Sequence, residues 1–329
     1  MKRRVARSTQ CMKSPKLVKT RDVINKGAAN KVVQEIKKRN GKARVCIIRG
    51  VGGIGDVLMT TPALRQLKEM FPRVHLTYAV DMHRAGNTYQ ELVYNAPFID
   101  EIVDARYVDR ANYDAVCDIS AVCIRFENRS LPPVNRIDLF ARALGITHMP
   151  NKLPFYSVTA VERSWAASIL DKYKSAGKRI VVLHTASFEG KRSWPAERNA
   201  ELVKLGDENT VFIIFDFNSV YGDWDKLDNV VDMSRTSVRE MAAIIEQADL
   251  FVGPDSGPMH IAGATRTNSL VIFGSIPPEA RINYYPTHSA IKLDGLSCLG
   301  CWYAACPIGV KCMADLSAQT VFERMVARV

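Results

Sequence analysis

The chain has 329 residues, enough for about two domains, and its 47% hydrophobic and 24% charged content is ordinary for a globular protein. No stretch approaches the roughly 18 uninterrupted apolar residues of a transmembrane helix. The N-terminus also lacks the apolar core of a signal peptide, so we expect a cytoplasmic protein without a transmembrane segment.

The net charge of +11 is concentrated at the N-terminus. Residues 1–44 hold 15 Lys or Arg against two acids, a net +13, whereas the remaining residues hold 30 against 32, a net −2. We therefore predict a basic N-terminal arm, residues 1–43, on a nearly neutral globular body. Such an arm attracts nucleic acid, acidic lipid headgroups or a polyanionic acceptor, or it is only a solvated extension.

In the first half, strand patterns alternate with helix patterns. Val45–Arg49 reads as a buried strand that leads into a glycine-rich turn. Thr61 and Pro62 are typical of an N-cap and a first helical residue, which predicts a helix from Pro62 to about Met70. Further strands are expected at Val74–Val80, Ile99–Val103 and Tyr113–Ile119, and a helix at Asn135–Leu144, ended by Gly145.

The second half repeats this alternation after an amphipathic helix at Val161–Ala176. Ser237 and Glu240 form a capping box for a helix that ends near Gln247. The other expected elements are strands at Arg179–Leu183, Thr210–Phe215, Leu250–Val252 and Ser269–Phe273, and helices at Ala196–Leu205 and Leu316–Val329.

Two such α/β series predict two Rossmann-like domains that face a cleft, each with a parallel sheet covered by helices. We divide the chain into the basic arm, an N-terminal domain, a linker helix, a C-terminal domain and a last helix. These are residues 1–43, 44–160, 161–177, 178–315 and 316–329.

The glycine turn is the first candidate site. Gly50, Gly52 and Gly55 satisfy the dinucleotide-binding pattern, and Asp81 ends the next expected strand. Against that interpretation, Asp56 would place a negative charge beside a pyrophosphate, and Pro62 would interrupt the helix. Both objections disappear if the loop, including Gly53, holds an acceptor and Asp56 acts as a base; Asp56 as a helix cap is the structural alternative.

Two further candidate sites lie in the second half. In GPDSGPMHIAGAT, a strand leads into a helix start that is suited to a diphosphate, formed by Asp255, Ser256 and Gly257. His260 contacts the phosphate or is a packed core residue, and Asp255 binds the donor or only caps the helix. In LHTASFEGKRSWP, the hydroxyl and cationic residues are suited to neutralising a leaving diphosphate; they are Thr185, Ser187, Lys191 and Arg192, and their alternative is a solvated basic loop.

Four cysteines near the C-terminus form a last candidate site, with the spacing C-x2-C-x4-C-x5-C. Their thiolates are close enough in sequence to surround one structural zinc, and a cytoplasmic setting disfavours disulfides. Packed reduced thiols are the main alternative, with a disulfide or redox role as a further one. The four are Cys298, Cys301, Cys306 and Cys312.

Together, these motifs over about residues 44–329 resemble the ADP-heptose:lipopolysaccharide heptosyltransferases, glycosyltransferase family 9, especially the heptosyltransferase II type. The similar segments are IRGVGGIGDVLMTTPALRQLK, KRSWPAER and GPDSGPMHIAGA, with the cysteine cluster followed by Met313. KRSWP carries one residue more between the basic pair and Trp194 than the family motif, which leaves Lys191 and Arg192 as alternative diphosphate clamps.

The resemblance implies a GT-B fold whose N-terminal domain holds the acceptor and whose C-terminal domain holds a nucleotide-diphospho-sugar. It implies that Asp56 is the general base and that Ser256, Gly257 and His260 cradle the diphosphate. It also implies inverting transfer that requires no catalytic cofactor, because cations and helix amides stabilise the leaving nucleotide.

We therefore expect an inverting glycosyltransferase with ADP-heptose as the donor and a polyanionic acceptor such as the lipopolysaccharide core, with possible peripheral membrane contact. Three alternatives stay open at this point. The arm suits a transferase that glycosylates a modified base in DNA; the glycine pattern with Asp81 suits an NAD-binding oxidoreductase; and a degenerate transferase would serve as a binding module.

Overall fold

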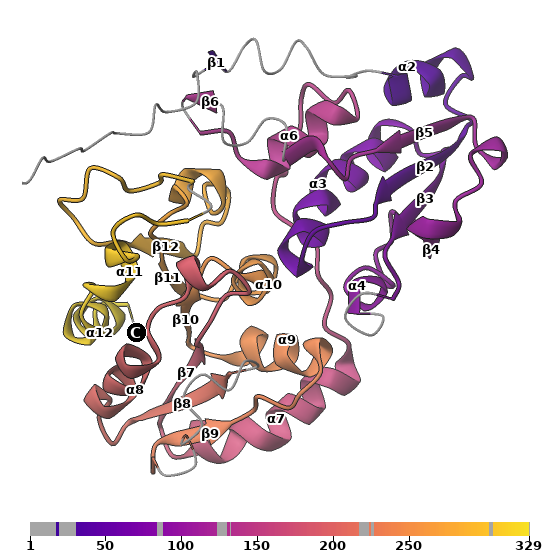
Figure 1. Ribbon diagram of the computed structural model, residues 1–329. Helices are drawn as coiled ribbons and strands as arrows, with labels where there is room; N and C mark the ends of the chain where they lie inside the picture. The colour runs from indigo at the N-terminus through magenta and orange to yellow at the C-terminus, as the bar shows by residue number, and fades with distance from the viewer. Residues whose placement is uncertain are drawn as a thin grey trace, which may run out of the picture.

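The computed structural model describes residues 18–19, 31–83, 88–123, 130–131, 133–216, 224, 227–302 and 305–328. It contains two larger parallel β-sheets, one in each half of the chain, with helices packed against them (Figure 1). A two-stranded pair, β1 (Val18–Lys19) with β6 (Ser130–Leu131), stands apart from both. The fold is therefore the predicted α/β arrangement of two Rossmann-like sheets. Most of the basic arm, residues 1–17 and 20–30, lies outside the described residues.

The N-terminal sheet has the strand order β4-β3-β2-β5. Its first strand in sequence, β2, therefore lies where the strand order reverses, which is where α/β sheets bind ligands. The strands are β2 (Arg44–Arg49), β3 (His75–Val80), β4 (Glu101–Asp104) and β5 (Ala115–Asp118). The helices are α2 (Lys31–Lys38), α3 (Ile54–Met70), α4 (Thr88–Glu91) and α6 (Arg136–Ala143), with short 3-10 turns η1 (Ala105–Tyr107) and η2 (Arg110–Asn112).

The C-terminal sheet has the order β12-β11-β10-β7-β8-β9, in which the strand order reverses between β7 and β10. Its edge strands β9 (Val230–Asp232) and β12 (His288–Ile291) were not predicted. The inner strands are β7 (Arg179–His184), β8 (Thr210–Phe215), β10 (Leu250–Pro254) and β11 (Ser269–Ile272). The helices are α7 (Ala160–Ser175), α8 (Ala196–Leu205), α9 (Val238–Gln247), α10 (Gly257–Thr265), α11 (Lys311–Ala314) and α12 (Ala318–Val326), with turns η4 (Gly190–Arg192) and η6 (Pro278–Ala280).

The predicted helix start at Thr61 and Pro62 is wrong. Helix α3 begins at Ile54, and Pro62 lies inside it. Because proline has no N–H, the carbonyl of Leu58 loses its helical partner. The Thr61 hydroxyl donates to that carbonyl at 2.6 Å and accepts the Phe155 N–H at 2.7 Å. This side-chain bond lets the helix continue through the proline, which removes the sequence argument for a break.

The predicted boundary of the basic arm, at residue 43, also lies too far toward the C-terminus. Residues 31–38 form α2, and Val32, Val33 and Ile36 on this helix are buried in the N-terminal core. Arg39, just after the helix, pairs with Asp114 before β5 at 2.9 Å. Residues 31–43 are thus part of the N-terminal domain, because the apolar residues between the lysines cover its sheet.

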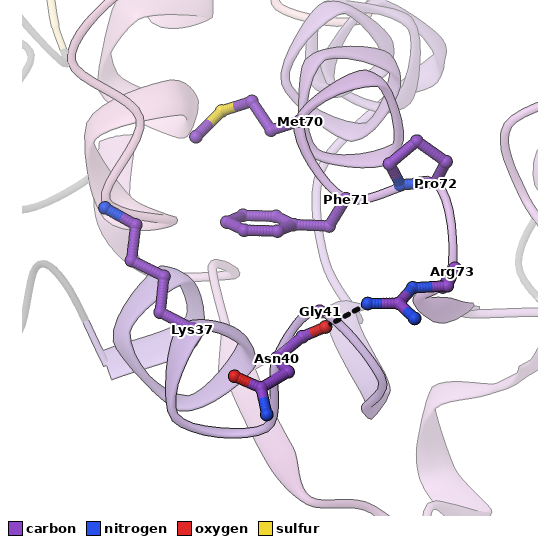
Figure 2. Close-up of a pocket in the computed structure, with 7 residues that line it drawn as sticks. All are labelled: Lys37, Asn40, Gly41, Met70, Phe71, Pro72 and Arg73. Atoms are coloured by element: carbon purple, nitrogen blue, oxygen red, sulfur yellow. Dashed lines mark hydrogen bonds between the residues drawn. The ribbon is translucent and has the colours of Figure 1, made fainter.

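An open hollow of about 310 Å³ lies where the C-terminal ends of α2 and α3 meet (Figure 2). Phe71 lies between Met70 and Lys37, and the Arg73 guanidinium donates to the Asn40 carbonyl at 2.5 Å. A helix of 17 residues is about 25 Å long, so this hollow is that far from the N-terminal end of α3.

The two domains contact each other directly. One hydrophobic core cluster includes residues of both sheets, and α3 and α10 meet between them (Figure 1). A Cβ added at Gly55 on α3 would lie 2.3 Å from the His260 ring on α10, so only glycine permits this approach. Asn135, before α6, donates to the carbonyls of Glu279 and Arg281 in the other domain, both at 3.2 Å. These contacts fix how the two switch points face each other.

Candidate active site

A cleft of about 730 Å³ lies between the two domains. Its walls come from the loops at the carboxyl ends of β2, β7 and β10, together with the starts of α3, α6 and α10. The residues from sequence analysis that line it are Gly52, Gly53, Gly55, Asp56, Ser187, Lys191, Arg192, Asp255, Ser256, Gly257 and His260. The structure therefore brings the three separate motifs to one site, two from the C-terminal sheet and one from the N-terminal sheet.

Asp56 lies on the N-terminal wall of the cleft. Its Oδ1 is 3.0 Å from Arg49 Nη2 and 2.6 Å from Arg136 Nη1, and its Oδ2 accepts the Gly53 N–H at 2.9 Å. Burial raises the pKa of this carboxyl, but Arg136 and Arg49 outweigh burial and lower the pKa to about 2. Asp56 thus bonds the N–H of the α3 N-cap residue, Gly53, and is an ionised group on the cleft.

The turn before Asp56 depends on Gly52. Its φ is +112°, and a Cβ there would meet Asp56 and Arg49 at 2.6 Å. The Tyr89 hydroxyl donates to the Gly52 carbonyl at 2.7 Å and fixes the loop from the other side. The glycine thus lets the carboxylate fold back against its arginines.

A second carboxylate, Asp255, occupies the matching position on the C-terminal wall. Arg192 Nη1 lies 3.0 Å and Arg281 Nε 3.4 Å from its Oδ2. Burial raises the pKa of Asp255, but Arg281 and Arg192 outweigh it and lower the pKa. The α10 N-cap is Ser256, and no side chain caps it. Asp255 therefore holds two cations in place rather than capping the helix.

The loop after β7 carries two buried polar side-chain atoms that a ligand in the cleft would satisfy. Ser187 Oγ and Arg192 Nε are buried and have no hydrogen-bond partner among the described residues. Both residues line the cleft next to Ser256 and Gly257 at the helix N-terminus. Buried polar groups are normally satisfied, and a helix N-terminus attracts anions, so this corner is suited to a phosphate group.

Two predicted donor residues are placed differently from the others. Thr185 does not line the cleft; it is buried and its hydroxyl donates to Asp216 at 2.7 Å. His260 lines the cleft, but its Nδ1 lies 2.7 Å from the Tyr285 hydroxyl, and burial lowers its pKa to about 3. Sequence analysis left two roles open for His260, phosphate contact and core packing. The neutral, buried imidazole fits core packing.

Sequence analysis missed three arginines beside the cleft carboxylates, of which Arg136 and Arg281 line the cleft. Arg49, Arg136 and Arg281 supply most of the charge next to the two carboxylates, and the Arg281 guanidinium lies 5.2 Å from the centre of the Trp302 ring. These residues lie outside the glycine-rich turns and helix starts that marked the site. Only the folded chain shows which carboxylates they meet.

The four C-terminal cysteines line one small cavity beside the cleft, and Lys191 lines both. Burial and the neighbouring thiols raise the pKa of Cys312. Across the described residues, however, no group of three or more His, Cys, Asp or Glu side chains is placed to hold a metal ion. The thiols therefore share a site but do not form a preorganised metal cage, and the zinc assignment stays a prediction.

Two Rossmann-like domains with their switch points across one cleft form the architecture of the GT-B glycosyltransferases. Residues 127–310 match the family model of glycosyltransferase family 9 (heptosyltransferase), which is more than half of the chain. The protein therefore belongs to glycosyltransferase family 9, and it is an enzyme of the glycosyltransferase class.

Individual relatives agree with this assignment. The chain is 23% identical over 302 residues to lipopolysaccharide heptosyltransferase 1 of Campylobacter coli, covering 71% of this chain and 84% of that protein. It is 26% identical over 161 residues to lipooligosaccharide heptosyltransferase 2 of Campylobacter jejuni, covering 45% of this chain and 51% of the relative. Among solved structures, the E. coli ADP-heptose lps heptosyltransferase II superposes with a TM-score of 0.63 at 18% identity, covering 86% and 98% of the two chains. The latter shows a shared fold.

These findings leave the other functional hypotheses unsupported. Asp81, on which the oxidoreductase reading depended, does not line the cleft, and its carboxylate accepts the His83 N–H. None of the relatives named above is described as acting on nucleic acid. In the part of the chain that the structure describes, no helix combines the length and apolar character needed to cross a membrane.

Proposed function

We propose that the protein transfers a heptosyl group from ADP-heptose to a sugar hydroxyl of the lipopolysaccharide inner core, with inversion at the anomeric carbon. The names of the Campylobacter and E. coli relatives support the donor and the acceptor. A cytoplasmic location belongs to the same proposal, because the seven described cysteines are free thiols, which suit a reducing compartment.

The observation that carries the proposal is the unsatisfied polar corner at the start of α10. On the loop after β7, Ser187 Oγ and Arg192 Nε are buried without partners among the described residues, and the free amides of the α10 start line the same cleft. A donor diphosphate would satisfy both atoms. Lys191, paired with Glu189 at 3.3 Å, lines the same wall and would neutralise the charge that develops on the leaving nucleotide.

On the opposite wall, Asp56 is the proposed base. The acceptor oxygen attacks the anomeric carbon as the bond from that carbon to the diphosphate oxygen breaks. The hydroxyl proton passes to Asp56, and the nucleoside diphosphate leaves toward Arg192, Lys191 and the α10 amides. Attack opposite the leaving group inverts the anomeric configuration.

We further propose that the transfer needs no metal ion, because cationic side chains and helix amides already stand where the leaving group's charge develops. A zinc ion on the four cysteines would then be structural. Chelation with EDTA is expected to leave the transfer rate unchanged. A rate that falls with EDTA and returns with a divalent cation would contradict this part of the proposal.

Product analysis tests the proposal as a whole. The full chain is incubated with nucleotide sugars that differ in base and in sugar, and with lipopolysaccharide core saccharides as acceptors, and the products are identified by mass spectrometry and NMR. We expect a heptosylated product from ADP-heptose with inverted anomeric configuration. Transfer only from another nucleotide sugar, or retained configuration, would overturn the donor or the mechanism.

A further inference from the structure

The two arginines on Asp56 differ in their exposure to the cleft. Arg49 is 3% exposed, and its Nη1 donates to the carbonyls of Ile119 and Ser120 at 3.1 and 2.7 Å. Arg136 is 21% exposed and lines the cleft at the first residue of α6. Both guanidinium groups reach the same oxygen, Oδ1. Arg49 is therefore a fixed partner of Asp56, and Arg136 is one that a bound ligand can reach.

We propose that Arg136 is an anion-binding residue for the acceptor, and that a carboxylate or phosphate next to the attacked hydroxyl draws Arg136 away from Asp56. The exchange frees Oδ1 on the cleft side while Arg49 and the Gly53 N–H keep the carboxylate in position. This exchange rests on the proposed function, because Asp56 is the base in that function. The acceptor class that follows is an acidic sugar, since a neutral sugar has no group to take the guanidinium.

The exchange answers a difficulty in the proposed mechanism. A carboxylate held by two cations has little affinity for the proton that a base must accept. Among the described residues, the charged and titratable groups that act on Asp56 are Arg49 on β2, Tyr78 on β3, Arg136 on α6, Arg281 after η6 and His260 on α10. Burial raises the pKa of Tyr78, so its phenol carries no charge. His260 is neutral and Arg281 is paired with Asp255, so Arg136 is the group here whose displacement changes Asp56 most. Binding an acidic acceptor thus makes Asp56 a stronger base when it is needed.

The kinetic test compares an acidic acceptor with the same acceptor after its acid group has been methyl-esterified. For the acidic acceptor, Arg136→Gln is expected to lower kcat/KM roughly 10- to 100-fold, the value of one charged hydrogen bond, with partial rescue in Arg136→Lys. For the ester, which cannot draw Arg136 away, Arg136→Gln should lose no activity, because the substitution itself removes the guanidinium from Asp56. Arg73→Gln, at the other end of α3, is the matched control and should behave as wild type. Equal losses with both acceptors would overturn the proposal.

A second readout is the pH profile, which a purely structural role would not change. In the wild type, the acidic limb of kcat should lie at a higher pH than that of kcat/KM, because Arg136 leaves Asp56 only in the complex. In Arg136→Gln the two limbs should coincide. Coincident limbs in the wild type would contradict the exchange.

A third measurement does not require turnover, so it separates failure of this inference from failure of the proposed function. The Asp56 carboxyl is followed by ¹³C NMR, assigned from the signal missing in Asp56→Asn, and titrated with acid with or without inorganic sulfate. Sulfate should raise the midpoint in the wild type and in Arg192→Gln, which weakens the donor-side anion corner, but not in Arg136→Gln. An unchanged midpoint in the wild type would overturn the exchange even if heptosyl transfer is confirmed.

Discussion

The two walls of the cleft carry the same arrangement of charged side chains, but the carboxylates differ in exposure. Each wall carries a carboxylate held by two arginines at the switch point of its sheet, Asp56 in the N-terminal domain and Asp255 in the C-terminal domain. The Asp56 side chain is 12% exposed and the Asp255 side chain 4%. Under the proposed function, the more exposed carboxylate serves the reaction, and the enclosed carboxylate positions its two arginines.

The largest expected effect is on the reacting wall. Asp56→Asn keeps the shape of the side chain and removes its ability to accept the proton, so the transfer rate should fall by roughly 10²-fold or more. Steady-state kinetics with saturating donor measure it, and the KM for the donor should change little. Transfer at the wild-type rate would show that Asp56 is not the base and would remove the contrast between the walls.

On the positioning wall, the same change should act on stability. Asp255→Asn removes the carboxylate shared by the buried Arg281 and the part-buried Arg192, and breaking a buried pair costs about 3–5 kcal/mol in the free energy of unfolding. Urea unfolding at pH 7 provides the value.

The pH dependence checks the same carboxylate. Because the pKa of Asp255 is lowered in the folded protein, its contribution is fully present above the unfolded value of about 3.9 and is lost as the pH falls through the folded value. The wild type and Asp255→Asn should therefore converge in stability below about pH 4. A constant difference down to the lowest accessible pH would contradict this electrostatic account.

A smaller effect is expected where the walls touch. Gly55→Ala places a methyl group on the His260 ring and must push α3 away from α10, at a cost of about 1–3 kcal/mol. Gly53→Ala is the matched control, because a Cβ there meets nothing within 4 Å and its φ of −111° is open to alanine. Thermal unfolding of both variants tests the contact; equal stabilities would show that the domains approach less closely than described.

An effect of similar size concerns the helix that carries Asp56. Thr61→Val keeps the side-chain shape but removes the hydroxyl that serves Leu58 and Phe155, which should cost about 1–3 kcal/mol. In Pro62→Ala the Leu58 carbonyl regains an N–H, so adding Thr61→Val to that background should cost less. Urea unfolding of the wild type, the two single variants and the double variant gives the coupling free energy between the two positions. Strictly additive losses of stability would show that the Thr61 hydroxyl does not replace the missing N–H of Pro62.

The predictions that succeeded rest on local rules. Helix α8 and strand β8 have the predicted bounds, and the Ser237–Glu240 capping box is present, because these depend on neighbouring residues. The motifs after β7 and β10 converge because neighbouring parallel strands end at one edge of their sheet, whereas the glycine turn after β2 belongs to the other sheet and meets them across the contact of α3 with α10.

The features that sequence analysis missed depend on residues that are distant in sequence, or on local sequence rules that predict different structures. Pro62 indicated a helix start because no sequence rule shows that Thr61 replaces the missing donor. Arg136 and Arg281 gave no signal, since their role exists only beside carboxylates 80 and 26 residues away in the sequence. The charge of residues 1–44 concealed the apolar face of α2.

Asn135 gives the cleft a mechanical property. It joins the two domains through the carbonyls of Glu279 and Arg281, and the next residue is the arginine on Asp56. A motion that separates the domains pulls on the chain next to Arg136, and it moves Arg281 at the same time. Asn135 therefore ties the spacing of the two domains to the positions of the arginines beside both cleft carboxylates, Arg136 at Asp56 and Arg281 at Asp255.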